Sequence, residues 1–464
     1  MDEQDSFRDS ISTVDKKGKR VWIFPKMPFG KLYNKRKLVS YFLLVLLFSG
    51  PYITISGEPL LLLNIIERKF VIFGQIFWPQ DLHIFALGMI VFILFVTVFT
   101  IVFGRLFCGW VCPQTIFMEM VFRRIEYWIE GDWKQQQLLA KSSWNNEKIF
   151  KAIAKQTIFW LISFLIANTF LAYIIGYKEL FHIISDNPLN HIGGLTSILV
   201  FTTIFYLVFS KFREQVCTVV CPYGRLQDVL LDKKSLVVAY DFVRGEKRSL
   251  FKKGEDRATV NKGDCIDCHQ CVNVCPTGID IRNGTQLECV NCTACIDACD
   301  FMMEKVGLKK GLIRFDSMEG IANKSKFKLT TRVLAYSGVL IFLLGVMITM
   351  LVGRSDFEAT VLRTRGTLFQ EVEKGVYSNI YDISLVNKTN KEMPIDIRVL
   401  KGDGEIKMIG DEIILKPQAE AQTKFMILIN ESDIHSRNLE LEIGIYSNDE
   451  LIEKVSTSFI IPLL

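Results

Sequence analysis

The stretch CIDCHQCVNVCP at residues 265–276 determines how the middle of this chain folds. A second stretch with the same cysteine spacing, CVNCTACIDAC, follows at residues 289–299. Each is a C-x2-C-x2-C-x3-C run, in which the first three cysteines wrap a tight loop and bring three thiolates together. A four-cysteine zinc site needs separate CxxC pairs. Two runs with this offset have the spacing of bacterial two-cluster ferredoxins.

In that pattern the fourth cysteine of each run binds the cluster of the other run. The sequence therefore predicts two [4Fe–4S] clusters. The first is expected on Cys265, Cys268, Cys271 and Cys299. The second is expected on Cys289, Cys292, Cys295 and Cys275. We expect the fourth cysteine of each run to start a short helix, and His269 to tune the first cluster by hydrogen bonding rather than bind iron.

The other four of the twelve cysteines form two further motifs, CGWVCP at 108–113 and CTVVCP at 217–222. If each motif is helical, its two cysteines lie four residues apart on one face. That arrangement presents two sulfurs to one soft metal ion, to a further cluster, or as a dithiol couple, and thiolates favour Cu(I). Pro113 and Pro222 fit the first turn of a following helix. The matched positions predict an internal duplication.

The composition places these motifs in a membrane protein. The chain has 464 residues, of which 50% are hydrophobic and 23% charged, and its mean hydropathy is +0.25. These values exclude a disordered or fibrous chain, and a net charge of +5 gives no support for nucleic-acid binding. Five stretches without Lys, Arg, Asp or Glu reach the ~20 residues needed to cross a bilayer. They are Leu38–Gly57, Leu82–Gly104, Gln156–Tyr177, Asn187–Ser210 and Val333–Gly353.

The segments between these stretches alternate in positive charge. Lys and Arg together number ten before Leu38, two in 58–81, eight in 105–155, one in 178–186 and twenty-one in 211–332. The positive-inside rule predicts that the N-terminus and all twelve cysteines are cytoplasmic, and that residues after Gly353 lie outside. Cysteines on the reducing side indicate metal or redox chemistry rather than disulfides. The basic stretches 16–20 and 35–37 are expected to contact anionic membrane lipid.

Residues 355–464 change to short alternating segments at 381–386, 395–400, 425–429 and 439–445. Several short strands at this spacing predict an Ig-like β-sandwich, held by its core because it contains no cysteine. His83, His182 and His191 fall on the exterior face of the predicted topology. Whether they bind copper or only form hydrogen bonds stays open.

Several segments resemble one known family. GRLFCGWVCPQT at 104–115 and REQVCTVVCPYGRLQ at 213–227 resemble the two CxxxCP signatures of the CcoG/FixG/RdxA family. Residues 70–74 and 77–81 resemble its first exterior loop, and 311–315 its segment after the clusters. The resemblance implies an accessory protein of the bacterial inner membrane, with a periplasmic Ig-like domain, that reduces Cu(II) to Cu(I) for assembly of cbb-type cytochrome oxidase. Oxidase assembly factors or copper chaperones are the implied partners.

The expected fold is a polytopic α-helical membrane protein with five transmembrane helices, an inserted two-cluster ferredoxin-like α+β domain and a C-terminal Ig-like β-sandwich. Its expected parts are a cytoplasmic basic segment 1–37, a four-helix region 38–212, a cytoplasmic region 213–331 with the ferredoxin-type domain at about 255–305, a fifth helix 332–353 and a periplasmic domain 355–464.

The expected function is that of an oxidoreductase, a cupric reductase. Electrons would pass from a cytoplasmic donor through the clusters to copper, which is substrate or transient ligand. The copper is expected on Cys108, Cys112, Cys217 and Cys221. Two alternatives stay open: a NapH/NosR-like relay from quinol or ferredoxin to a periplasmic reductase, and a non-catalytic copper-delivery scaffold. The sequence does not determine the electron donor, the cluster potentials, the partner of the Ig-like domain, or whether the chain forms a homodimer.

Overall fold

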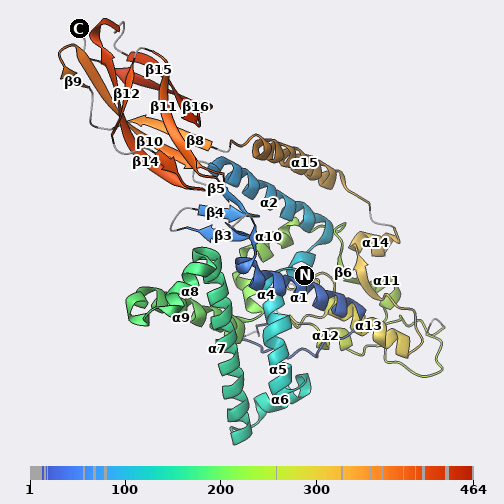
Figure 1. Cartoon of the computed structure of the whole chain (residues 1–464). Coiled ribbons are helices and arrows are strands. Elements are labelled where there is room, and N and C mark those ends of the chain that lie inside the picture. The colour runs from blue at the N-terminus through green and yellow to red at the C-terminus, as the bar shows by residue number, and fades with distance from the viewer. Residues whose placement is uncertain are drawn as a thin grey trace. The chain divides into compact units, whose positions relative to one another are not determined.

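The computed structural model describes residues 13–461, apart from gaps at 15–16, 18, 56–57, 66–68, 78–80, 258, 326–327, 356, 365, 367–368, 390, 403, 410–412, 418 and 434–437 (Figure 1). The start of the predicted segment 1–37 and residues 78–80 of the family-like loop therefore lie outside the described residues. Two compact units are present. One comprises Met1–Phe73 and Phe77–Met347, and the other Gly74–Ile76 and Ile348–Leu464.

Four helices in the described part of the chain are long and apolar enough to cross a membrane. They are α2 (Leu82–Phe103), α7 (Asn146–Ile175), the segment Pro188–Phe212 and α15 (Thr331–Val352). The third combines η5 (Pro188–His191), α9 (Ile192–Leu207) and the π-helical η6 (Val208–Phe212). A helix such as α2, apolar on all sides rather than along one stripe, fits a lipid environment. Four of the five predicted stretches coincide with these helices.

The remaining predicted stretch, Leu38–Gly57, differs from the structure at both ends. Helix α1 runs from Lys31 to Ser49, followed by η2 (Gly50–Tyr52). The helix ends here because Pro51 cannot donate a backbone hydrogen bond to continue it. Short strands follow, namely β1 (Thr54–Ile55), β2 (Glu58–Pro59), β3 (Leu61–Asn64), β4 (Lys69–Ile72) and β5 (Gln75–Phe77). The predicted number of five spans is therefore not confirmed.

Each CxxxCP motif follows the end of an apolar helix and leads into another helix. After α2 come α3 (Leu106–Trp110), α4 (Pro113–Ile116), the π-helical η4 (Phe117–Phe122), α5 (Arg123–Glu130) and α6 (Trp133–Lys141). After α7 come α8 (Tyr177–Ser185) and the segment with α9, then the π-helical η7 (Val216–Val220) and α10 (Pro222–Leu230). Pro113 and Pro222 start α4 and α10, as predicted.

The duplication is also visible in the backbone. Gly104 and Arg213 each stand four residues before the first cysteine of their motif, and both take positive φ, 58° and 54°. The chain therefore turns in the same way after each apolar helix. For Arg213 this left-handed conformation is unfavourable by about 1–2 kcal/mol, so contacts of its side chain must hold it.

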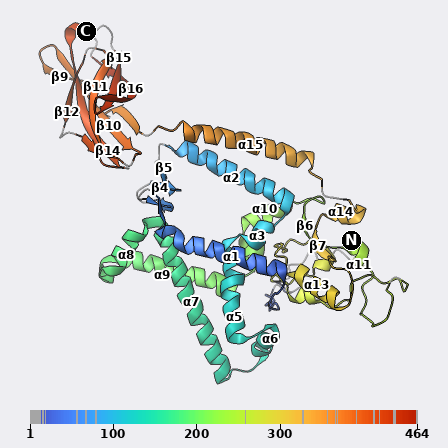
Figure 2. The same cartoon turned by 45° about the vertical axis from the view of Figure 1, so that its right-hand side comes forward.

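The cysteine-rich region lies between two paired strands and contains several short helices. Strands β6 (Val237–Tyr240) and β7 (Ile313–Asp316) pair antiparallel and enclose α11 (Phe242–Gly245), α12 (Gln270–Asn273), η8 (Ile281–Asn283) and α13 (Ala294–Lys305), and α14 (Met318–Asn323) follows. Val238, Ile279, Ile296 and Leu312 bury their side chains among the cysteines. The start of α1 lies beside α13 (Figure 2).

The second unit is a two-sheet sandwich. One sheet contains β8 (Phe357–Arg363), β9 (Gln370–Glu373), β10 (Val376–Asn387), β12 (Glu405–Ile409) and β14 (Glu420–Asn430). The other contains β11 (Met393–Lys401), β13 (Ile413–Leu415), β15 (Asn438–Ser447) and β16 (Glu450–Ile460), and η9 (Glu431–Asp433) follows β14. The four predicted segments lie in β10, β11, β14 and β15. Tyr381, Phe425 and Ile443 are fully buried between the sheets.

Replacing Phe425 with Ala should destabilise this sandwich by about 3–5 kcal/mol, because the ring is fully buried and stacks on Tyr381 at 5.4 Å between centroids. Hydrogen exchange of the full-length protein measures the loss as faster exchange of β10 and β14 amides. Leu362→Ala is the control, since Leu362 is 63% exposed. Equal exchange in the two variants would contradict a core role for Phe425.

Candidate iron–sulfur and four-cysteine site

The two cysteine runs of residues 265–299 share an unusual backbone. Asp267 and His269, on either side of Cys268, have φ of 51° and 55°. Asn291 and Thr293, on either side of Cys292, have φ of 52° and 67°. Alternation of left-handed and right-handed residues points successive N–H groups into one concavity, as in anion-binding and iron–sulfur loops. Four such residues at matched positions are a strained arrangement that suits an anionic group.

The third cysteine of each run, not the fourth, lies in the first turn of a helix. Cys271 lies in α12 and Cys295 in α13, while Cys299 lies one turn further along α13 and Cys275 follows α12. The expectation that the fourth cysteine starts a helix was wrong. The left-handed residues His269 and Thr293 stand at the N-caps and decide where each helix begins.

The thiols fall into two groups of four. Burial, together with the charges of Cys271, Cys268 and Cys265, raises the pKa of the Cys299 thiol. Burial also raises the pKa of Cys295, to which the charges of Cys292, Cys289, Cys275 and, least, Cys271 contribute. A small cavity is lined by Cys275, Cys289, Cys292 and Cys295, together with Cys271 of the first group. Four thiolates around one cavity fit a [4Fe–4S] cluster, in which each cysteine binds one iron. Which cysteines bind which cluster stays a prediction.

His269 does not reach into the cysteine group. Its ring is 53% exposed, and its Nδ1 lies 2.9 Å from the carbonyl oxygen of Asp267. Buried Arg282 is closer to the first group, where its charge opposes the rise in the pKa of Cys271, which burial takes to about 12. Arg282 pairs with Asp280 and Asp267 at 2.6 and 2.5 Å.

The structure brings the four CxxxCP cysteines into one region. Burial raises the pKa of Cys108 to about 11, and Cys112 and Cys221 add to the rise. Burial raises the pKa of Cys217 to about 12, with Cys112, Cys108 and Cys221 contributing. The free thiols of Cys108 and Cys217 are therefore protonated at neutral pH, and a bound metal would have to displace these protons.

Neither CxxxC motif is helical through to its second cysteine, so the condition for two cysteines on one helical face is not met. Cys112 and Cys221 are N-cap residues in extended backbone, with ψ of 124° and 111°, because Pro113 and Pro222 start new helices directly after them. The Cys221 sulfur accepts the N–H of Gly224 at 3.4 Å. Cys112 stands at the same place before α4. Each motif thus presents its second sulfur at the start of a helix.

We refer to Cys108, Cys112, Cys217 and Cys221 as the four-cysteine site. Among the described residues, no three His, Cys, Asp or Glu side chains are grouped closely enough to hold one metal ion. The four thiols therefore share a region without forming a closed single-ion site. The Nε2 of His191, one of the three histidines considered as copper ligands, lies 3.0 Å from Asp186.

The four-cysteine site packs directly against the second cysteine run. A Cβ on Gly109 would lie 2.3 Å from the carbonyl oxygen of Val290 and 3.0 Å from the Cα of Cys292, so only glycine permits this approach. Cys108 belongs to one buried apolar cluster with Val290 and Cys292. Its sulfur also donates to the Oε1 of Gln227 at 3.0 Å. The first CxxxC turn therefore lies on the loop of the predicted second cluster.

The N-terminal segment is fixed to the same region. The carboxylate of Asp297 accepts the N–H groups of Leu32 and Tyr33 at 3.2 and 2.8 Å, and so caps the start of α1 from α13. Gly30 permits this contact, because a Cβ there would meet Asp297 at 2.4 Å. Arg36, 1% exposed, donates from Nε to the carbonyl oxygen of Gly109 at 2.7 Å.

A buried ion-pair network joins the two motifs. Arg213 binds Glu126 through two parallel bonds of 2.9 and 2.8 Å, and both side chains are 4% exposed. Arg123 pairs with Glu119, and also with Glu214 at 3.6 Å. Because Arg213 and Glu214 precede the second motif and the other three follow the first, the network fixes one motif relative to the other. It also holds Arg213 in its left-handed conformation. The sequence analysis missed this network, whose signal is the Glu119, Arg123 and Glu126 spacing on one helical face.

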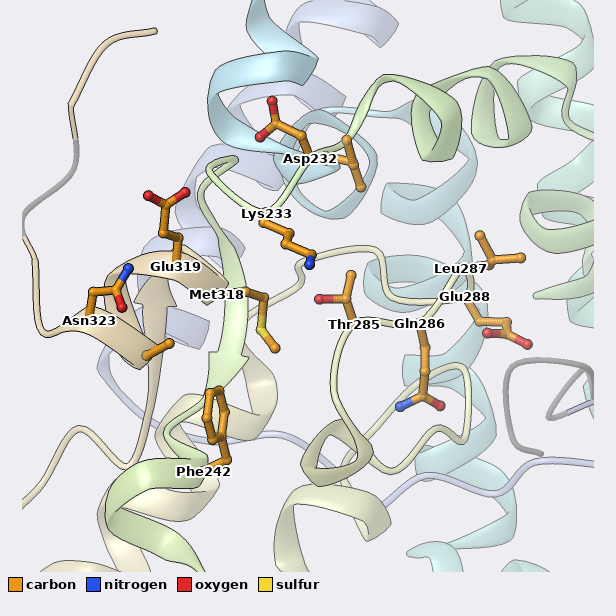
Figure 3. A pocket seen from close by; sticks show the side chains of 12 residues that line it. Asp232, Lys233, Phe242, Thr285, Gln286, Leu287, Glu288, Met318, Glu319 and Asn323 are labelled. Carbon is orange, nitrogen blue, oxygen red and sulfur yellow. The ribbon is translucent and has the colours of Figure 1, made fainter. Parts of the chain in front are cut away.

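A solvent-side pocket of about 700 Å³ borders the loop before Cys289. Figure 3 shows Lys233 and Met318 on one wall, facing Thr285. Leu287 lines the pocket, while its carbonyl oxygen accepts a hydrogen bond from Arg105. The loop of residues 285–288 therefore lines this pocket on one side and bonds Arg105, before the first CxxxCP motif, on the other.

Comparisons with known proteins agree with this arrangement. A family model described as a 4Fe-4S dicluster domain matches residues 212–318, one described as a 4Fe-4S binding domain matches 85–134, and one described as an IG-like fold at the C-terminal of FixG matches 347–462. The chain is 32% identical to Protein RdxB of Cereibacter sphaeroides over 429 residues. This match covers 89% of each of the two chains.

The chain belongs to the FixG/RdxA family. It is 30% identical to the nitrogen fixation protein FixG of Rhizobium meliloti, over 91% of this chain and 92% of FixG. It is 31% identical to Protein RdxA of Cereibacter sphaeroides, over 71% of each chain. With its four apolar helices, the chain is a membrane-associated iron–sulfur electron-transfer protein with an oxidoreductase role. The family resemblance, the iron–sulfur clusters and the Ig-like domain are confirmed.

Gly109→Ala should disturb the second cluster selectively. The added Cβ meets the backbone of Val290 and Cys292, and overpacking of this kind costs about 1–3 kcal/mol. We expect the electron paramagnetic resonance (EPR) signal of one reduced cluster to change while the other stays as in the wild type. Gly338→Ala is the control, because nothing lies within 4 Å of its added Cβ. Identical spectra for both variants and the wild type would show that the two loops can separate freely.

Proposed function

We propose that this protein is a cupric reductase of the bacterial inner membrane, which delivers one electron to Cu(II) at the four-cysteine site during assembly of a cbb-type oxidase. The observation that carries the proposal is the contact of the Cys108–Cys112 turn with the loop of Cys289 and Cys292. A site that reduces a metal ion needs a redox centre at close range, and here the thiols that favour Cu(I) lie against a cysteine loop that fits a cluster.

In this proposal the chain's own residues bind copper and shield it from water. Thiols on two separate helix starts reach copper from two sides, and loss of their protons gives the soft ligands that stabilise Cu(I) over Cu(II). Arg105, 3% exposed, offsets the negative charge that thiolates bring into this buried region. Tyr223, Val290 and Ala294 cover Cys108 with apolar surface and exclude water.

The electron balance is simple. Cu(II) gains one electron and becomes Cu(I), and a reduced cytoplasmic one-electron carrier of the ferredoxin or flavodoxin class loses that electron. When bound, the [4Fe–4S] clusters supply one-electron storage between the two. The pocket beside Leu287 and Glu288 offers such a donor a surface on the loop that ends at Cys289.

Replacing all four of Cys108, Cys112, Cys217 and Cys221 with Ala should lower Cu(II) reduction to less than about a tenth, because the soft ligands are gone. Absorbance of a cuprous chelator after anaerobic mixing of dithionite-reduced, desalted protein with Cu(II) measures the rate. Val219→Ala, between Cys217 and Cys221 and 44% exposed, is the matched control. An unchanged rate in the four-alanine variant would place copper reduction elsewhere.

A second candidate role for the four-cysteine site is a further [4Fe–4S] cluster. The family model described as a 4Fe-4S binding domain covers residues 85–134, which include Cys108 and Cys112. Iron analysis of the same variants separates the two roles. A copper site predicts that the wild type and the four-alanine variant both hold about eight irons, whereas a third cluster predicts a loss of about four.

We also propose that α1 is a fifth span, with both the N-terminus and the clusters in the cytoplasm and the Ig-like domain in the periplasm. Support comes from the two ends of α1. Its start is capped by Asp297 of the cysteine-rich region, and near its end the hydroxyl of Tyr173, in the last turn of α7, donates to the Leu47 carbonyl at 2.8 Å.

Epitope tags test this topology. A tag inserted after Ile65 should be cleaved by protease added outside spheroplasts, like a tag at the C-terminus. A tag at the N-terminus should be protected until the membrane is broken, as should a control tag after Gly131. Cleavage of the N-terminal tag in intact spheroplasts would remove α1 as a span and leave four.

A further inference from the structure

Arg105 lies between the two redox sites of the chain. It is 3% exposed, and its Nη1 donates to the carbonyl oxygen of Leu287, two residues before Cys289. The same residue stands three positions before Cys108. Its Nη2 lies 2.9 Å from the position that a Cβ on Gly224 would take. The planar guanidinium therefore bonds the second cysteine run and lies next to the second CxxxCP motif, a geometry that lysine cannot reproduce.

The charge of Arg105 is buried close to both sites. Its Nη1 bonds the carbonyl oxygen of Leu287, two residues before Cys289, and the residue stands three positions before Cys108. The first cysteine group has a different buried arginine, Arg282, which pairs with Asp267 beside Cys268. Four thiolates give an iron–sulfur cluster a negative charge, and its potential depends on net charge and hydrogen bonding around it. A buried positive charge near Cys289 therefore favours an electron on the second cluster.

We propose that Arg105 is a positioning residue that joins the second-cluster loop to the four-cysteine site and sets how an electron divides between the two clusters. The proposal rests on the proposed function for its purpose, since an electron held on the second cluster is next to the four-cysteine site. Its physical content is independent of copper.

Redox titration of the anaerobic, iron-loaded full-length protein, followed by EPR without copper, tests the proposal. Arg105→Gln should lower the potential of the second cluster relative to the first, and change the ratio of electron occupancies about tenfold, which is 59 mV for one electron. A Cys289→Ser variant assigns the signals. Arg105→Lys keeps the charge and should stay within about threefold of the wild type. The matched control is Arg225→Gln, which removes an equal charge from an exposed position on α10.

If the Arg105→Gln protein assembles no clusters, the same titration is made on Gly224→Ala. The Cβ added there would displace the Arg105 guanidinium without removing its charge. A shift of the second-cluster potential in the same direction supports the proposal. An unchanged ratio in loaded Arg105→Gln or Gly224→Ala protein, or an equal shift in Arg225→Gln, overturns it. Failure of the copper proposal looks different: the four-alanine variant then reduces Cu(II) normally, whatever the cluster ratio.

Discussion

The close approach of Gly109 to Val290 is the contact on which the rest of the functional region depends. It leaves no room for a side chain, so it fixes the first CxxxC turn on the loop that carries Cys289 and Cys292. Arg36 then reaches the carbonyl of Gly109, and Arg105 reaches the carbonyl of Leu287. Both arginines are buried because they lie between the first CxxxCP motif and the cysteine-rich region, which this contact brings together.

The ion-pair network around Arg213 and Glu126 serves the same arrangement from the other side. The network brings the second motif to the first, and its carboxylates and guanidinium groups pair with one another in the buried interior. Breaking one partner of such a pair is costly because it leaves a buried charge. The two halves of the duplication are therefore similar in backbone but different in charge, with Arg105 before the first motif and Glu214 before the second.

Much of the fold could be predicted because its signals are local. Spacing within 265–299 predicts two groups of thiols, and the structure gathers the cysteines accordingly. Apolar length predicts α2, α7, α9 and α15, and alternation predicts the strands of the sandwich. Where a helix differs from the expectation, a nearby proline decides where the helix ends or where the next one begins. Pro51 ended α1 early, and Pro113 and Pro222 start new helices, so that Cys112 and Cys221 stand in extended backbone.

The sequence by itself determined the kinds of site this protein carries, because cysteine spacing and apolar length act within short stretches of chain. Only the tertiary structure decided which cysteine group lies against the four-cysteine site and which arginine stands between them. Arg105 and Leu287 are 182 positions apart, and Asp297 accepts the N–H of Leu32, 265 positions earlier, at the start of α1. Contacts over such distances depend on how whole elements pack, and no spacing along the chain encodes them.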